Sequence, residues 1–168
     1  IRRAVDFLIS LPEVDPQRIG CTGWSQGGQM TLIGAALDTR IRAIASVCGW
    51  SPLRGLSSGP VAENLMQSYN FPRLRPYSTS HAILPFDFDH LAALIAPRPF
   101  LDIRAKADAF FPNIKDIEPC NKEIRALYSK YGNVDRFRPL WVDGPHAFTA
   151  TSAREVQAWF YKWFWADY

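Results

Sequence analysis

The sequence is poor in cysteine and has no long apolar segment. Its three cysteines, Cys21, Cys48 and Cys120, include no CxxC pair, which argues against a disulfide framework and against a structural zinc site. No apolar run reaches the roughly 18 residues that a membrane-spanning helix needs, so no membrane span is expected. The 19 Lys and Arg residues barely outnumber the 16 Asp and Glu residues and form no long basic stripe, so nucleic-acid binding is not expected.

The composition is that of a globular protein with one domain. Of the 168 residues, 48% are hydrophobic and 21% are charged, which excludes a disordered chain and suffices for a core. We therefore treat residues 1–168 as a single domain. The chain begins within an amphipathic pattern and without a methionine, so we expect a processed or partial chain.

Apolar periodicity predicts strands that alternate with helices. The predicted strands are 18–22, 41–47, 100–105 and 137–142, and the predicted helices are 2–10, 29–37, 87–95, 117–131 and 151–165. This alternation favours a mainly parallel sheet covered by helices, so the fold class is α/β. Residues 49–86 interrupt the pattern with prolines and aromatics, and they are predicted to form a lid or pocket excursion with a short helix near 62–68.

A nucleophile motif lies between the first strand and the helix that follows it. Gly23-Trp24-Ser25-Gln26-Gly27 matches the pattern G-x-S-x-G, in which a sharp turn lifts the serine hydroxyl clear of the sheet. We expect Gly23 and Gly27 to be required because the turn leaves no room for bulk. The turn also directs the backbone N–H of Gln26 toward a developing oxyanion.

A serine nucleophile needs an imidazole base and an orienting carboxylate. Of the three histidines, only His146 follows a predicted strand, whereas His81 and His90 lie in or beside the excursion. In the chain order Ser, acid, His, we assign the acid to Asp108, which follows the third strand. Asp102 lies within that strand and Asp143 is too close to His146. The sequence thus predicts a triad of Ser25, Asp108 and His146.

These motifs resemble the α/β-hydrolase superfamily, in particular its branch of dienelactone hydrolases and acetyl xylan esterases. The resemblance is carried by residues 14–20 before the elbow, by the elbow itself, by Ala96-Pro97-Arg98-Pro99, by Asp108 and by Gly144-Pro145-His146. Residues 84–87 and 91–99 also resemble the glucuronoyl esterases. The resemblance implies a three-layer α/β/α sandwich and hydrolysis of carboxylic esters, such as acyl esters of carbohydrates, without metal or organic cofactor. The family has about four further strands before this point, so we expect only the C-terminal half of the fold.

The excursion is expected to shape the alcohol side of the substrate pocket, because it leaves the second strand beside the nucleophile. The side chains that we expect to contact substrate are Trp50, Tyr69 and Tyr77, which could stack on sugar rings, and Arg54, Arg73 or Arg75, which could bind an acidic group. The alternative is a structural lid whose aromatics pack inward.

Three other functions fit parts of the sequence. A peptidase of the prolyl-oligopeptidase type has the same kind of elbow and triad, so the motif alone does not separate peptide from ester substrates. A binding module on a hydrolase scaffold would not need all three triad positions to be filled. A metal site at His81, Asp87, Asp89 and His90 has suitable ligand types, but helix capping and the helix dipole explain the two aspartates.

Overall fold

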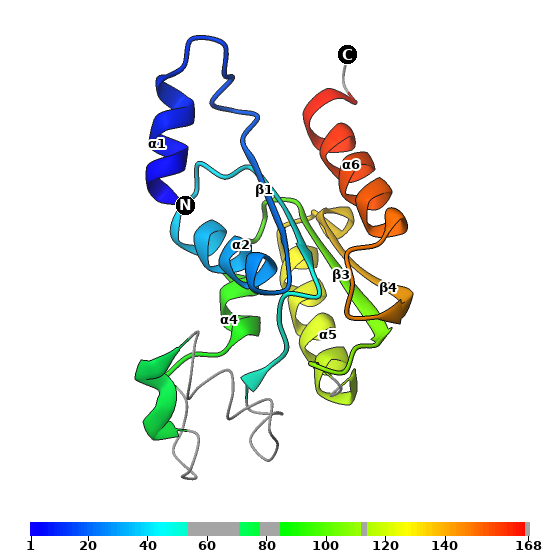
Figure 1. The fold of residues 1–168 in the computed structure, drawn as a ribbon. Helices are drawn as coiled ribbons and strands as arrows, with labels where there is room; N and C mark the ends of the chain where they lie inside the picture. Colours follow the sequence, from blue (N-terminus) through cyan, green and yellow to red (C-terminus); the bar gives the residue numbers. More distant parts are fainter. Residues whose placement is uncertain (54–70, 78–84, 112–113, 167–168) are drawn as a thin grey trace.

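The computed structural model describes residues 1–53, 71–77, 85–111 and 114–166. Its sheet has four parallel strands in the order β1 (Gly20–Trp24), β2 (Ala43–Val47), β3 (Phe100–Ala107) and β4 (Phe137–Pro145). The helices are α1 (Arg2–Ser10), α2 (Gln26–Leu37), α4 (Phe88–Ala93), α5 (Ile114–Lys130) and α6 (Ala150–Trp165), with short 3₁₀ turns η3 (Pro72–Tyr77) and η4 (Val134–Arg136). The predicted α/β class and parallel sheet are confirmed (Figure 1).

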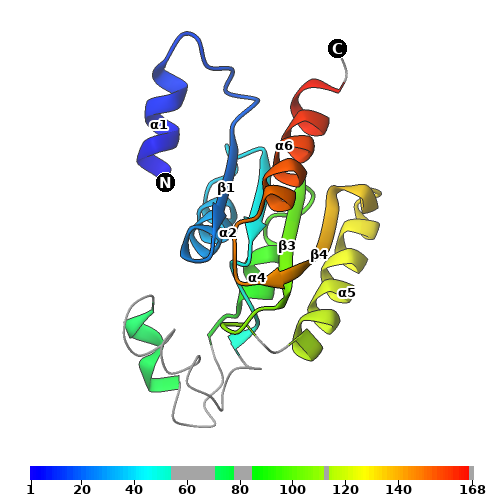
Figure 2. The ribbon, with the colours of Figure 1, turned by 45° about the vertical axis from the view of Figure 1, so that its right-hand side comes forward.

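Helices cover both faces of the sheet and make three layers. One face packs against α2, α4 and α5, where Ile44, Phe100 and Phe137 from three strands share a core with Leu32 and Tyr128. On the other face, neighbouring strand residues such as Ala45 and Leu101 pack against Val156 and Trp159 of α6. The course of α6 relative to the strands can be followed in Figure 2. Side chains that alternate between two apolar cores are what a parallel sheet buried on both faces requires.

The helix α6 lies close to the first strand because one residue there has no side chain. A Cβ on Gly20 would lie 2.6 Å from Cε1 of Phe160, which is nearer than any ordinary contact. Gly20 therefore permits the ring of Phe160 to lie against β1, and the α6 layer extends across the sheet.

An ion-pair network joins α1 to the end of α2. The guanidinium of Arg40 contacts Asp6 Oδ1 at 2.8 Å and Asp38 Oδ2 at 2.6 Å. The hydrogen bonds from Arg40 lower the pKa of the Asp38 carboxyl to about 2. The network therefore ties α1 to the connection between α2 and β2, and the buried side chain of Val5 adds a core contact.

Several boundaries differ from those expected, and the third and fourth strands are longer. Pairing between β3 and β4 continues past a register shift to Ala107 and Pro145, although the apolar patterns end at 105 and 142. The predicted short helix near 62–68 lies outside the described residues. None of the described helices combines the length and apolarity needed to cross a membrane.

Candidate active site

Each strand of the sheet is followed directly by a residue with a reactive side chain. Ser25 follows β1, Cys48 follows β2, Asp108 follows β3 and His146 follows β4. Because the strands are parallel, these four positions lie along one edge of the sheet. The candidate active site is therefore built by the sheet itself.

The elbow has the backbone that its motif predicts. Ser25 has φ 54° and ψ −120°, a conformation that an L residue rarely adopts and that costs about 1–3 kcal/mol. A Cβ on Gly23 would lie 2.8 Å from Gly27 Cα and closer still to the Gly27 carbonyl, so a glycine is required at position 23.

The expectation for the second glycine of the motif is wrong. A Cβ on Gly27 would meet no described atom within 4 Å, because this residue faces away from the turn. Gly28 has the crowded place instead, since a Cβ there would lie 2.7 Å from Gly49 Cα. The close approach of α2 to the end of β2 therefore depends on Gly28.

The side chains of Ser25, His146 and Asp108 form a continuous hydrogen-bonded chain. His146 Nε2 lies 2.8 Å from Ser25 Oγ, and His146 Nδ1 lies 2.7 Å from Asp108 Oδ2. With Nδ1 protonated and donating to the carboxylate, Nε2 is the acceptor for the serine hydroxyl, which is the arrangement of a general base. The structure brings together the three residues that the sequence predicted for this role.

Backbone groups hold the carboxylate of Asp108 in place. Its Oδ1 accepts hydrogen bonds from the N–H groups of Phe110 at 2.9 Å and Phe111 at 3.1 Å, and its side chain is 5% exposed. Oδ2 is thereby left to face His146. The two acids that the sequence excluded from the triad form ion pairs elsewhere. Asp102 is fully buried and pairs with Arg104, and Asp143 pairs with Lys106 at the surface.

Cys48 is a member of this site that the sequence did not reveal. Its thiol, a carboxylate oxygen of Asp108 and a ring nitrogen of His146 all lie within 4.8 Å of one another. Burial raises the pKa of the Cys48 thiol to about 11, and the nearby Asp108 adds to this effect. Cys48 is buried, and its thiol lies beside the hydrogen-bonded side chains of Asp108 and His146.

Cys48, Asp108 and His146 are also the one group of described residues that could jointly hold a metal ion. The His146–Asp108 hydrogen bond at 2.7 Å already occupies one ligand atom of each residue. Their engagement in the chain to Ser25 explains their positions without a metal.

Aromatic side chains surround the imidazole. The rings of Trp24 and Phe110 lie 5.4 Å and 4.8 Å from that of His146 and are 44% and 59% exposed. Phe111 lies 5.9 Å from it and is buried. Exposed aromatics beside a nucleophile offer an apolar surface for substrate. The sequence signal for them is adjacency, because Trp24 precedes Ser25 and Phe110 follows Asp108 by two residues.

Gln26 has the position expected for an oxyanion donor. It is the first residue of α2 and directly follows Ser25, so its N–H lies at the positive end of the helix beside the nucleophile.

The expected substrate contact through Trp50 is wrong for this structure. Trp50 is 1% exposed, its indole N–H donates to Asp102 Oδ1 at 3.1 Å, and the guanidinium of Arg104 lies 4.2 Å above its ring. The ring therefore has no free face for a sugar. Arg54 and Tyr69 lie outside the described residues, as do the side chains of Arg75 and Tyr77, and Arg73 is exposed on η3.

Asp87, one of the two acids near α4, has a structural role. Asp87 Oδ1 accepts from the N–H groups of Phe88 and Leu53, both at 2.7 Å, and so caps the helix. His90 Nδ1 in turn accepts from the N–H of Asp87 at 3.2 Å. His81, the remaining member of the metal site considered from the sequence, lies outside the described residues.

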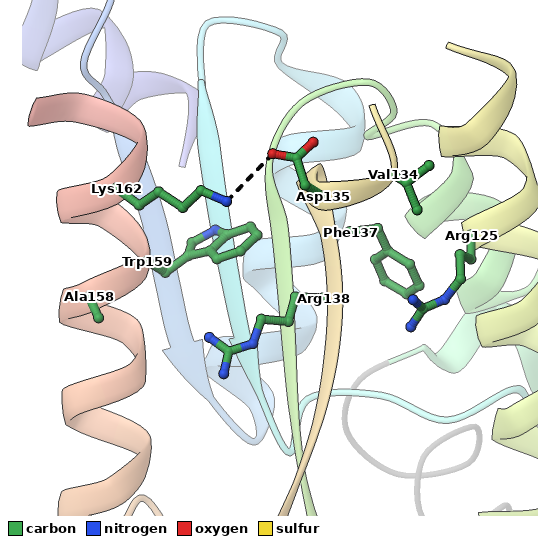
Figure 3. Close-up of a pocket in the computed structure, with 8 residues that line it drawn as sticks. All are labelled: Arg125, Val134, Asp135, Phe137, Arg138, Ala158, Trp159 and Lys162. Atoms are coloured by element: carbon green, nitrogen blue, oxygen red, sulfur yellow. Dashed lines mark hydrogen bonds and ion pairs between the residues drawn. The ribbon is translucent and has the colours of Figure 1, made fainter. Parts of the chain in front are cut away.

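A surface pocket of about 580 Å³ lies at the start of β4, between α5 and α6 (Figure 3). Arg125, Phe137 and Trp159 line it, and the Lys162–Asp135 ion pair at 3.5 Å closes part of it. None of the triad residues lines this pocket, so it is separate from the candidate active site.

Comparison with known families places the chain. The model of the family described as "Glucuronyl esterase, fungi" matches residues 1–132. The chain belongs to this glucuronyl esterase family. The resemblance to the α/β-hydrolase superfamily is thereby confirmed, and the parallel sheet with its elbow is the corresponding part of that fold.

Individual relatives agree with this family. "Putative hydrolase YtaP" of Bacillus subtilis is 29% identical over 95% of this chain and 50% of its own length. "4-O-methyl-glucuronoyl methylesterase 1" of Sodiomyces alcalophilus is 27% identical over 82% of this chain and 30% of its own length. The chain thus spans half or less of the length of these curated relatives.

A solved structure of similar fold carries a bound ester. It is a glucuronoyl esterase from Sporotrichum thermophile in complex with methyl 4-O-methyl-β-D-glucopyranuronate. Its TM-score is 0.71 at 19% identity, and the match covers 95% of this chain and 49% of that chain.

Proposed function

We propose that the protein is a serine hydrolase that cleaves carboxylic esters of carbohydrates through an acyl-enzyme on Ser25. The observation that carries the proposal is the chain of hydrogen bonds from Ser25 Oγ through His146 to Asp108, at 2.8 Å and 2.7 Å. Membership of the glucuronyl esterase family supports a carboxylic ester as substrate.

The proposed reaction begins with attack of Ser25 Oγ on the ester carbonyl carbon. His146 Nε2 accepts the serine proton, and Asp108 stabilises the imidazolium that forms. The N–H of Gln26 donates to the oxyanion of the tetrahedral intermediate. His146 then protonates the leaving alcohol, and a water molecule activated by the same imidazole hydrolyses the acyl-enzyme.

The relatives suggest on which side of the ester the sugar lies. In methyl 4-O-methyl-β-D-glucopyranuronate the sugar supplies the carbonyl carbon and methanol is the alcohol. We propose the same arrangement here, so that a uronic acid becomes the acyl group on Ser25. This differs from an acyl group carried on a sugar hydroxyl, which the acetyl xylan esterase resemblance implied.

The test uses the complete protein with two substrates, a methyl ester of 4-O-methyl-glucuronate and 4-nitrophenyl acetate. Ser25→Ala and His146→Ala should each lower kcat by about 10⁴-fold or more, and Asp108→Asn by somewhat less. Asp143→Asn is the matched control, because that carboxylate is exposed and pairs with Lys106, and it should leave kcat unchanged. A fluorophosphonate should label Ser25 and not the Ser25→Ala variant.

Each outcome has a consequence. An Asp108→Asn enzyme within a few-fold of the unmodified protein would remove Asp108 from the triad. Preference for acetyl esters over the uronate ester would return the sugar to the alcohol side. Cleavage of peptides with both esters left intact would contradict the proposed function.

A further inference from the structure

A buried arginine lies behind the triad and has no part in the reaction proposed above. Arg104 of β3 is 5% exposed, and its Nε donates to Asp102 Oδ2 at 2.6 Å. Its Nη1 donates to the carbonyl oxygen of Trp50 at 2.7 Å. Two of the three guanidinium nitrogens are thus held by the protein, which fixes the direction of the third.

That third nitrogen, Nη2, is buried and has no hydrogen-bond partner in the part of the chain that the structure describes. A buried donor without an acceptor is destabilising by about 1–3 kcal/mol and by more when the group is charged. Folded proteins pair nearly all such groups with protein or with ordered water. We therefore expect Arg104 Nη2 to donate to an acceptor that is not among the described protein atoms.

A small cavity provides the space for one. It has a volume of about 10 Å³, and the residues that line it include Arg104, Asp108, Cys48, Phe111 and Ile117. A cavity of this size accommodates about one water molecule. Arg104 and Asp108 are its only charged lining residues among those described, so a molecule inside it meets a cationic donor and a carboxylate acceptor.

Asp108 has an acceptor position to spare. A carboxylate offers about four acceptor sites. Asp108 uses two on Oδ1 for the N–H groups of Phe110 and Phe111, and one on Oδ2 for His146. Asp108, with its unused acceptor site, and Arg104, with its unused donor, both line this cavity.

We propose that Arg104 is a positioning residue of the triad, which it contacts through one water molecule in this cavity. The water accepts from Arg104 Nη2 and donates to Asp108, so the carboxylate is held from behind while it faces His146. The ion pair with Asp102 and the contact with the face of the Trp50 ring hold the guanidinium in the orientation that this contact needs. This inference rests on the proposed role of Asp108 as the triad acid.

The first test is Arg104→Lys in the complete protein, assayed with 4-nitrophenyl acetate. A lysine keeps the charge beside Asp102 but has a single nitrogen, which cannot serve Asp102, Trp50 and the cavity together. We expect kcat per active site, counted by fluorophosphonate titration, to fall about tenfold with KM unchanged, since a hydrogen bond to a charged group is lost.

Arg98→Lys is the matched control. Arg98 is also partly buried and also donates to backbone carbonyls, of Ala35 at 2.7 Å and Ile41 at 2.9 Å, but it lies at the opposite edge of the sheet. Its replacement should lower the free energy of unfolding and leave kcat per active site unchanged.

A double-mutant cycle with Asp108→Asn separates positioning from a general structural effect. If Arg104 acts through Asp108, Arg104→Lys should lower kcat by less than about twofold in the Asp108→Asn background. An equal loss in both backgrounds would overturn the proposal. An Asp108→Asn enzyme with normal kcat would instead contradict the triad assignment, so the two failures are distinguishable.

A measurement on the unmodified protein covers the case in which Arg104→Lys does not fold. A crystal structure at high resolution should show one water within hydrogen-bond distance of both Arg104 Nη2 and the Asp108 carboxylate. A dry cavity, or a water that contacts only one of the two, would refute the inference.

Discussion

Substituting each glycine of the elbow by alanine gives two opposite predictions from one motif. At Gly23 the new Cβ would lie 2.8 Å from Gly27 Cα, whereas ordinary contact begins near 3.4 Å. The gap must therefore open by at least 3.4 − 2.8 = 0.6 Å, and by more to clear the Gly27 carbonyl. Ser25 lies between these two residues, so it must move with them.

The expected size of the effect follows from the Ser25–His146 distance. At 2.8 Å the hydrogen bond tolerates little displacement, and a misplacement of about 1 Å can lower kcat by about 10²-fold. Overpacking should also lower the free energy of unfolding by about 1–3 kcal/mol. Gly27→Ala meets no described atom within 4 Å and places a better helix former in the first turn of α2. It should leave kcat unchanged and raise the free energy of unfolding by up to about 1 kcal/mol.

Both variants of the complete protein would be assayed for kcat on 4-nitrophenyl acetate and for unfolding in urea. The reasoning is refuted if Gly23→Ala retains kcat within twofold, or if Gly27→Ala loses as much activity as Gly23→Ala.

Three further predictions concern other parts of the fold. Because burial raises the pKa of Cys48 to about 11, its thiol should resist iodoacetamide at pH 8 in the folded protein and react once urea is added. Rapid labelling of Cys48 in the native protein, measured by mass spectrometry, would contradict its burial. Because Arg40 lowers the pKa of Asp38 to about 2, this carboxylate stabilises the fold above its unfolded pKa of 3.8 and loses that effect as pH falls toward 2. Asp38→Asn should therefore be less stable than the unmodified protein at pH 7, and this difference should shrink as the pH falls from about 4 through 2. A constant difference in circular-dichroism melts across this range would rule the linkage out. Gly20→Ala should destabilise the protein by about 1–3 kcal/mol because the new Cβ overlaps Phe160, and a second change, Phe160→Leu, should restore part of the loss in urea unfolding.

The triad could be predicted from sequence because three signals coincide on it. Ser25 has a motif, His146 follows a strand, and Asp108 is the acid at a strand end between them in chain order. Each signal is local in the sequence. Because the strands are parallel, the residues that follow them lie close together in the fold. Chain order and strand position exclude the other acids, and Asp108 Oδ2 lies 2.7 Å from His146 Nδ1.

The remainder of the site depends on packing, which local patterns do not encode. Nothing in the residues around Cys48 indicates that its thiol lies beside Asp108 and His146. Trp50 is an aromatic residue of the kind that often binds sugars. Its indole N–H nevertheless donates to Asp102, which is buried and paired with Arg104, so the ring lies in the core. The motif treats Gly23 and Gly27 alike, and only the course of the backbone shows which one is crowded.

The order of the strands relates the time at which the site forms to the direction of synthesis. Each strand pairs with the one before it in the sequence, so the sheet can grow from β1 to β4 as the chain emerges. Ser25 precedes its base His146 by 121 residues, and His146 directly follows β4. We expect a chain in which only β1 to β3 have formed to carry Ser25 without its base. We therefore expect Ser25 to react with a fluorophosphonate only after β4 has docked and brought His146 to the nucleophile.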